Sequence, residues 1–146
     1  MSPVEEGMIR RKLAAIVENL KALEPIALMT QGQYLEDLYK RKATERLLQE
    51  LIEAAIDINT YIIVQTGHAI PDDYYESFIK AGALQIISSD LAEKLAPSAG
   101  LRNRLVHEYN MLEHSVVLDA VRKAEELYTE YVRQVENYIQ ETQNAR

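Results

Sequence analysis

Residues 47–64 of the sequence read LLQELIEAAIDINTYIIV, and their apolar side chains are distributed nearly all round a helix. Such a pattern is typical of the central helix of a bundle, because neighbouring helices cover it on most sides. Its polar exceptions include Glu53 and Asp57, which are four residues apart and therefore share one helical face. The stretch predicts an all-α fold built around one buried helix.

Apolar residues elsewhere in the chain also recur at helical spacing, and no run alternates as a strand would. Five glycines and four prolines leave few breaks between these stripes. We therefore expect an up-and-down helical bundle of about four to five main helices, formed by residues 1–146 as a single domain. The N-terminal stripe is Ile9, Leu13, Ile16, Leu20 and Leu23, and the C-terminal stripe is Val117, Val121, Ala124, Tyr128, Tyr131, Val135 and Tyr138.

Local signals predict where several helices begin and end. Pro25 is expected to end the first helix, since the residue before a proline disfavours helical geometry. The run KRK at residues 40–42 suggests a solvated bend, and Gly67 suits the position just after a helix C-terminus. Residues 97–100, PSAG, are expected to separate two helices, and Ser115 is expected to cap the last one.

Composition excludes several classes of protein. The chain has no cysteine, which excludes disulfides, zinc–thiolate sites and thiol catalysis. It shows no apolar segment typical of a signal peptide and no stretch long enough to cross a bilayer, so we expect a cytoplasmic protein without membrane contact. The net charge of −7 argues against indiscriminate RNA binding, and any action on RNA would need a local basic cleft.

The last helix carries a second apolar line, formed by Leu118, Leu127 and Val132. Two apolar faces on one helix indicate burial on two sides, and one of these can be a subunit interface. Because two-fold dimers are the commonest oligomers, we expect a homodimer.

Residues 102–109, RNRLVHEY, bring together side chains suited to phosphate chemistry. Arg102 offers a permanently charged, planar fork of donors that matches phosphate oxygens. His107 can accept and donate protons near neutral pH. Asn103 adds an amide, and Tyr109 adds a hydroxyl that can donate a hydrogen bond or be modified.

Helical geometry divides this segment into two faces. Arg102 and Tyr109 fall nearly on one line, while Asn103 and His107 share another. Arg102 and His107 lie about 140° apart around a straight helix. Either the backbone is irregular near one end, or a complete site takes residues from two chains.

Glu53 and Asp57 are candidates for a supporting role. A buried acidic pair requires partners, and Arg102 or Arg104 could supply one. The pair does not make a metal site, because no histidine or third carboxylate accompanies it at ligand spacing. We therefore expect no metal and no cofactor.

The motif Arg-x4-His-x-Tyr within residues 100–109, GLRNRLVHEY, resembles the signature of the HEPN superfamily, and more narrowly of its HepT toxins. Residues 43–49 and 53–58 resemble the central helix of that family, and residues 67–78 resemble the loop that follows it. Together the similar segments extend over residues 8–138, nearly the whole chain.

The resemblance implies a metal-independent endoribonuclease toxin of a type VII-like toxin–antitoxin system, active as a homodimer on RNA such as tRNA or mRNA. His107 would act as general base or acid in the attack of a ribose 2′-hydroxyl on the adjacent phosphate, Arg102 would stabilise the phosphorane, and Asn103 would orient the phosphate or the histidine. The resemblance also implies that an MntA-like nucleotidyltransferase antitoxin silences the toxin by transferring AMP to Tyr109.

Two alternatives remain at the level of the sequence. One is a non-catalytic, nucleotide-binding partner module of a nucleotidyltransferase, in which the Tyr109 segment binds nucleotide or accepts AMP. The other is a structural helical dimer.

Overall fold

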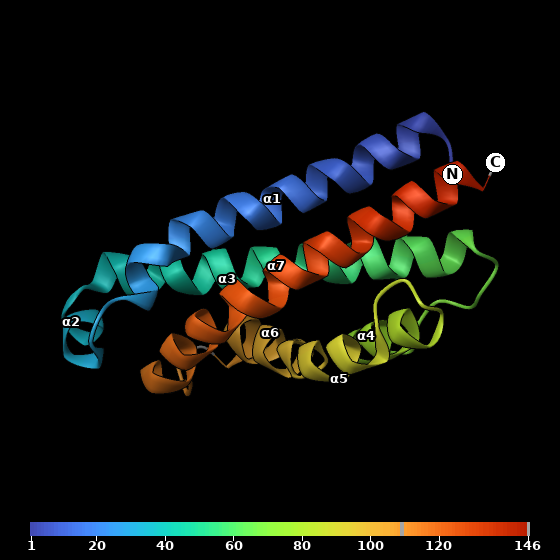
Figure 1. Ribbon diagram of the computed structural model, residues 1–146. Coiled ribbons are helices and arrows are strands. Elements are labelled where there is room, and N and C mark those ends of the chain that lie inside the picture. Colours follow the sequence, from blue (N-terminus) through green and yellow to red (C-terminus); the bar gives the residue numbers. More distant parts are fainter. Residues whose placement is uncertain (109, 146) are drawn as a thin grey trace.

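The computed structural model describes residues 1–108 and 110–145, which form seven α-helices and no strand (Figure 1). The all-α prediction is confirmed, and five of these helices have ten residues or more. The helices are α1 (Pro3–Ala27), α2 (Gln31–Glu36), α3 (Leu38–Gln65), α4 (Tyr74–Ala83), α5 (Ser89–Leu95), α6 (Pro97–His107) and α7 (His114–Asn144).

The long helices α1, α3 and α7 run beside one another, and α4, α5 and α6 lie along one side of them (Figure 1). Helix α3 packs against α1, α4 and α6, which confirms its predicted central position. Its apolar residues supply much of the core, and most of them are inaccessible to solvent because the neighbouring helices cover them. The buried apolar residues of α3 are Leu48, Leu51, Ile52, Ala54, Ala55, Ile56, Ile58, Ile62 and Ile63.

Helix α7 is joined to α3 by a buried hydrogen bond. The hydroxyl of Tyr131 lies 2.6 Å from Asn59 Oδ1 and 3.1 Å from the carbonyl oxygen of Ala55, so it donates its single proton between two acceptors. Burial raises the pKa of Tyr131 well above its ordinary value, which keeps the hydroxyl protonated as a donor. The predicted stripe of α7 is buried except at Tyr138, which is half-buried beside the fully buried Ile139.

Two helix boundaries differ from those that the sequence predicts. Helix α1 continues through Pro25 to Ala27, because burial of Ile26 favours one more turn and a proline there removes a single hydrogen bond. The bend expected at residues 40–42 occurs instead at Asp37, whose carboxylate accepts a hydrogen bond from the backbone N–H of Lys40 at 3.0 Å. Residues 40–42 therefore belong to the first turns of α3.

Two predicted starts are also displaced, while one predicted end is confirmed. Pro97 opens α6 instead of separating it from the helix before, because a proline at the first helical position loses no hydrogen bond. Helix α7 begins at His114 with Glu113 as its N-cap, so Ser115 lies inside the first turn. Gly67 follows α3 with φ +88°, the left-handed conformation expected of it.

The second apolar line of α7 is only partly available to a partner. Leu118 is buried within the chain and belongs to the core, whereas Leu127 and Val132 are partly exposed. The homodimer remains a prediction that rests on these two residues. No helix in the described part of the chain is long and apolar enough to cross a membrane.

Candidate active site

Arg102 lies on the side of α6 that packs against α3, and its side chain is only 15% exposed. Its Nη2 donates a hydrogen bond to Glu53 Oε2 at 3.3 Å, forming an ion pair between α6 and α3. Its Nη1 donates to Asn103 Oδ1, also at 3.3 Å. The structure thus confirms that an arginine of the motif neutralises Glu53, and it assigns that contact to Arg102.

Two residues that the sequence analysis missed complete the surroundings of Arg102. Gln49 Nε2 donates to the other oxygen of Glu53 at 2.9 Å, so both carboxylate oxygens are engaged. The guanidinium carbon of Arg102 lies 4.9 Å from the centre of the Tyr74 ring, where the ring face attracts a cation. Arg102 is therefore fixed by contacts from α3, α4 and α6.

The sequence indicates a role for Gln49 more strongly than for Tyr74. Gln49 is four residues before Glu53, a helical spacing at which a glutamine and a carboxylate commonly bond. Tyr74 is 28 positions from Arg102, and nothing in the local sequence indicates that the start of α4 meets α6.

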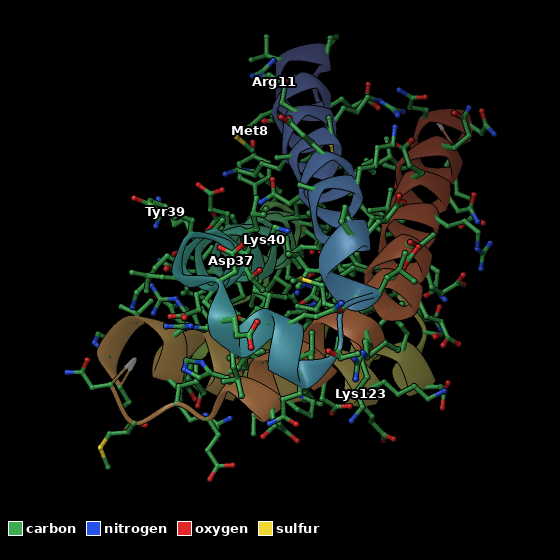
Figure 2. The ribbon with its side chains drawn as sticks, turned by 90° about the vertical axis from the view of Figure 1, so that its left-hand side faces the viewer. Met8, Arg11, Asp37, Tyr39, Lys40 and Lys123 are labelled. Carbon is green, nitrogen blue, oxygen red and sulfur yellow. The ribbon has the colours of Figure 1, made fainter. Side chains whose placement is uncertain are left out.

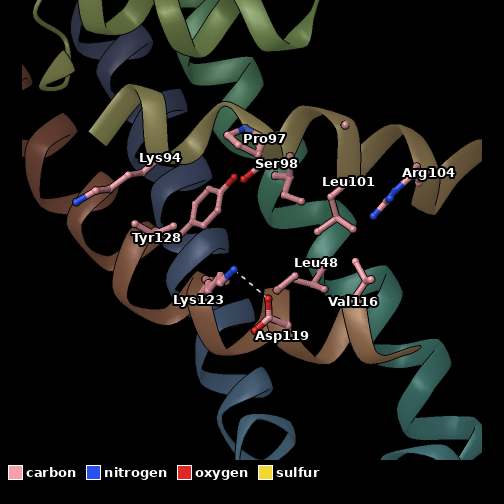
Figure 3. Close-up of a pocket in the computed structure, with 15 residues that line it drawn as sticks. Leu48, Lys94, Pro97, Ser98, Leu101, Arg104, Val116, Asp119, Lys123 and Tyr128 are labelled. Atoms are coloured by element: carbon pink, nitrogen blue, oxygen red, sulfur yellow. Dashed lines mark ion pairs between the residues drawn. The ribbon is translucent and has the colours of Figure 1, made fainter. Parts of the chain in front are cut away.

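Asp57 and Arg104 lie apart from the Arg102 site. Asp57 is exposed and pairs with Lys12 of α1 at 3.1 Å. The prediction that Glu53 and Asp57 form a buried acidic pair is therefore wrong. The cause is that α1 packs along that side of α3 and presents Lys12 there. Arg104 is exposed on another face of α6 and borders a mainly apolar groove of about 400 Å³ between α3, α6 and α7, whose floor includes Leu48 (Figure 3).

His107 is the last residue of α6, and both His107 and Asn103 are exposed. Because α6 is one continuous α-helix from Pro97 to His107, an irregular backbone between Arg102 and His107 is excluded. The two residues therefore point about 140° apart and the chain does not bring them together. Tyr109 lies outside the described residues.

The arrangement can bind an anion and move a proton. A guanidinium held in place by a carboxylate and an aromatic ring is oriented before a phosphate arrives, which reduces the entropy lost on binding. An exposed imidazole can exchange protons with a reacting group or with water. Among residues 1–108 and 110–145, no group of three or more histidine, aspartate or glutamate side chains could hold a metal ion.

Comparison with known families and proteins gives a consistent result. The family described as Ribonuclease HepT-like matches residues 13–135. The chain is 39% identical over 142 residues to the tRNA nuclease HepT of Aphanizomenon flos-aquae, covering 95% of each protein. It is 27% identical over 125 residues to the mRNA nuclease HepT of Shewanella oneidensis, covering 86% of this chain and 93% of the relative.

A solved structure of similar fold is the tri-AMPylated Shewanella oneidensis HEPN toxin in complex with its MNT antitoxin. The TM-score is 0.80 at 26% sequence identity, and the superposition covers 94% of this chain and 99% of that toxin. The likeness extends over almost the whole of both chains.

The two ion pairs of α3 provide a matched test of how firmly Arg102 is held. In Glu53–Arg102 the side chains are 34% and 15% exposed, against 56% and 36% in Asp57–Lys12. Double-mutant cycles to alanine, read from the free energy of unfolding in urea, should give a coupling above about 1 kcal/mol for the first pair. The exposed pair should give less than about 1 kcal/mol. Equal couplings would show that Glu53 does not anchor Arg102.

Proposed function

The chain belongs to the HepT-like ribonuclease family, and from this we propose that it is an endoribonuclease toxin that cuts RNA with Arg102 and His107 and is silenced by AMP transfer to Tyr109. The observation that carries the proposal is the ion pair between Glu53 and Arg102, because it holds a phosphate-binding guanidinium in one orientation on the motif helix. In this proposal residues 1–146 act as one domain.

The proposed reaction is an internal transfer at a phosphodiester. The ribose 2′-oxygen forms a bond to the adjacent phosphorus while the bond from phosphorus to the 5′-oxygen breaks, which leaves a cyclic phosphate and a free 5′-hydroxyl. A base takes the proton of the 2′-hydroxyl, and an acid gives one to the departing 5′-oxygen. His107 serves in one or both of these proton transfers.

Arg102 stabilises the negative charge that grows on the phosphate oxygens as the 2′-oxygen attacks. A guanidinium carries five N–H donors, so it can bind phosphate while Glu53 keeps Nη2 in place. Donors already oriented toward developing charge cost little reorganisation during the reaction, which is a main source of catalytic rate. Asn103, bonded to Nη1, helps to orient the phosphate.

We place each complete site across two subunits. His107 is about 7.5 Å farther along the axis of α6 than Arg102 and faces another direction, so one chain does not direct both residues at one phosphate. In a homodimer with two-fold symmetry, Arg102 of one subunit can meet His107 of the other. The partly exposed Leu127 and Val132 of α7 suit the interface of such a dimer.

The relatives suggest the class of substrate and the mode of control. Those named above are a tRNA nuclease and an mRNA nuclease, so a cellular RNA of one of these classes is the proposed substrate. The similar solved toxin carries AMP groups and is bound to its antitoxin. We assign the same control to Tyr109, two residues after His107: its hydroxyl oxygen would bond to the α-phosphate of ATP as pyrophosphate leaves. The added phosphate would repel RNA.

Replacing His107 by alanine should lower the rate of RNA cleavage by about 10² to 10⁴, because the proton transfer loses its side-chain catalyst. His107 is exposed, so the thermal unfolding temperature should hardly change. The matched control is His68→Ala, since His68 is an exposed histidine in the loop after α3. Cleavage by His107→Ala at the rate of the unchanged protein would refute the nuclease mechanism.

Mixing two inactive variants tests the shared site. When Arg102→Ala and His107→Ala subunits are refolded together, each mixed dimer regains one intact site, and about one quarter of full activity should return. Mixing Arg102→Ala with the double variant Arg102→Ala/His107→Ala should restore nothing. If the first mixture is as inactive as its components, each site lies within one chain.

Replacing Tyr109 by phenylalanine should prevent AMP transfer, because the acceptor oxygen is removed. Mass spectrometry after co-expression with the partner nucleotidyltransferase should find AMP on the unchanged chain and on Tyr75→Phe, a control that alters an exposed tyrosine of α4. The Tyr109→Phe chain should carry none and should remain toxic. AMP attached to Tyr109→Phe as fully as to the control would exclude Tyr109 as the acceptor.

A further inference from the structure

The start of α3 is basic although the whole chain is acidic. Residues 38–46, LYKRKATER, contain four basic residues and one acidic residue, a net charge of +3, in a chain of net charge −7. Since RNA is repelled by an acidic surface, a local concentration of positive charge is where its phosphates are most readily accepted.

This basic segment and the Arg102 site share one face of α3. Tyr39, Lys42, Arg46, Gln49 and Glu53 follow one another at steps of three, four, three and four residues, so they fall within an arc of about 80°. The last of them bonds to Arg102, and Gln49 bonds to Glu53. The face therefore extends from the Arg102 site to the N-terminal end of α3.

The N-terminal part of this face is open to solvent. Tyr39 is 87% exposed, and Figure 2 shows it projecting outward on the side of the molecule where α6 lies. The side chain of Arg46 is 64% exposed and pairs with Glu50 at 3.3 Å, a surface contact weak enough for a phosphate to displace. Lys42, also exposed, lies between them along the helix.

We propose that Tyr39, Lys42 and Arg46, called here the α3 track, bind a single-stranded segment of the RNA substrate and lead it to Arg102. The inference rests on the proposed nuclease function and adds a site for the RNA outside the reacting phosphodiester. Tyr39 is about 21 Å from Glu53 along the helix axis. At about 3.4 Å per stacked nucleotide, this length corresponds to about six nucleotides.

The chemistry of the track fits single-stranded RNA. Proteins bind single strands by combining cationic side chains that follow the phosphates with aromatic rings on which bases stack. An exposed tyrosine followed by a lysine and an arginine at helical spacing supplies both elements on one line. A double helix would leave the Tyr39 ring without an unstacked base to contact.

The test measures RNA binding separately from cleavage. A fluorescein-labelled single-stranded RNA of about eight nucleotides is titrated with His107→Ala protein at several salt concentrations, and fluorescence anisotropy reports the affinity. Arg46→Ala should reduce the slope of log affinity against log salt by about one, because one phosphate contact is lost. Tyr39→Ala should weaken binding on the order of tenfold, whereas Tyr39→Phe should keep it, because stacking needs the ring alone.

The control for charge is Arg133→Ala. Arg133 is 60% exposed and paired with Glu130 on α7, much as Arg46 is paired with Glu50, but it is not on the track. In the chain with His107 intact, Arg46→Ala should raise the KM for RNA and leave kcat unchanged, and Arg133→Ala should change neither.

Equal affinity and equal salt slope for Arg46→Ala and Arg133→Ala would overturn the track. Variants of Tyr39 and Arg46 that keep their RNA affinity but no longer bind the antitoxin would overturn it too, in favour of a protein contact. RNA that binds through the track but is not cut by the unchanged chain would instead refute the proposed function and leave the track standing.

Discussion

The ion pair between Arg102 and Glu53 is the contact on which both the packing of α6 and the candidate chemistry depend. Glu53 is a half-buried charge between buried apolar residues of α3, and such a charge destabilises a fold unless it is paired. Pairing it with Arg102 fixes which side of α6 faces α3, and hence leaves Asn103 and His107 toward solvent. The residue that binds α6 to the core is thus also the one proposed to bind the phosphate.

Much of the fold follows from the apolar patterns of α3 and α7, because long buried stripes leave few alternatives to a helical bundle. The local signals near Pro25 and at residues 40–42 were less informative, since a breaking residue shows that a turn is near but tertiary burial decides where the helix ends. At the site, the acidic pair expected to be buried led to the prediction that Arg102 or Arg104 supplies a partner, and Arg102 does so for Glu53. The partner of Asp57 could not be predicted, because it depends on where α1 lies and not on its neighbours in sequence.

The acidity of the chain and its membership of a ribonuclease family are compatible if positive charge is concentrated and not spread. Long-range repulsion by a net charge of −7 lowers the affinity for arbitrary RNA, while the start of α3, with its net charge of +3, favours one line of approach. A surface with this charge distribution binds arbitrary RNA weakly but can discriminate between RNA molecules. Through the proposed α3 track, such a surface would favour RNA that presents an unpaired segment, and this would restrict the RNAs that the ribonuclease cuts.

The continuity of α6 also bears on control. If each complete site takes Arg102 from one subunit and His107 from the other, an AMP group on Tyr109 of one chain lies in sequence beside that chain's own His107. It therefore obstructs first the site that this His107 serves. If the two sites of the proposed dimer are separate, the site served by the other subunit's His107 stays open until that subunit is modified as well. Complete silencing by the proposed AMP transfer would then require modification of both subunits, whereas two sites in one cleft would be closed by a single modification.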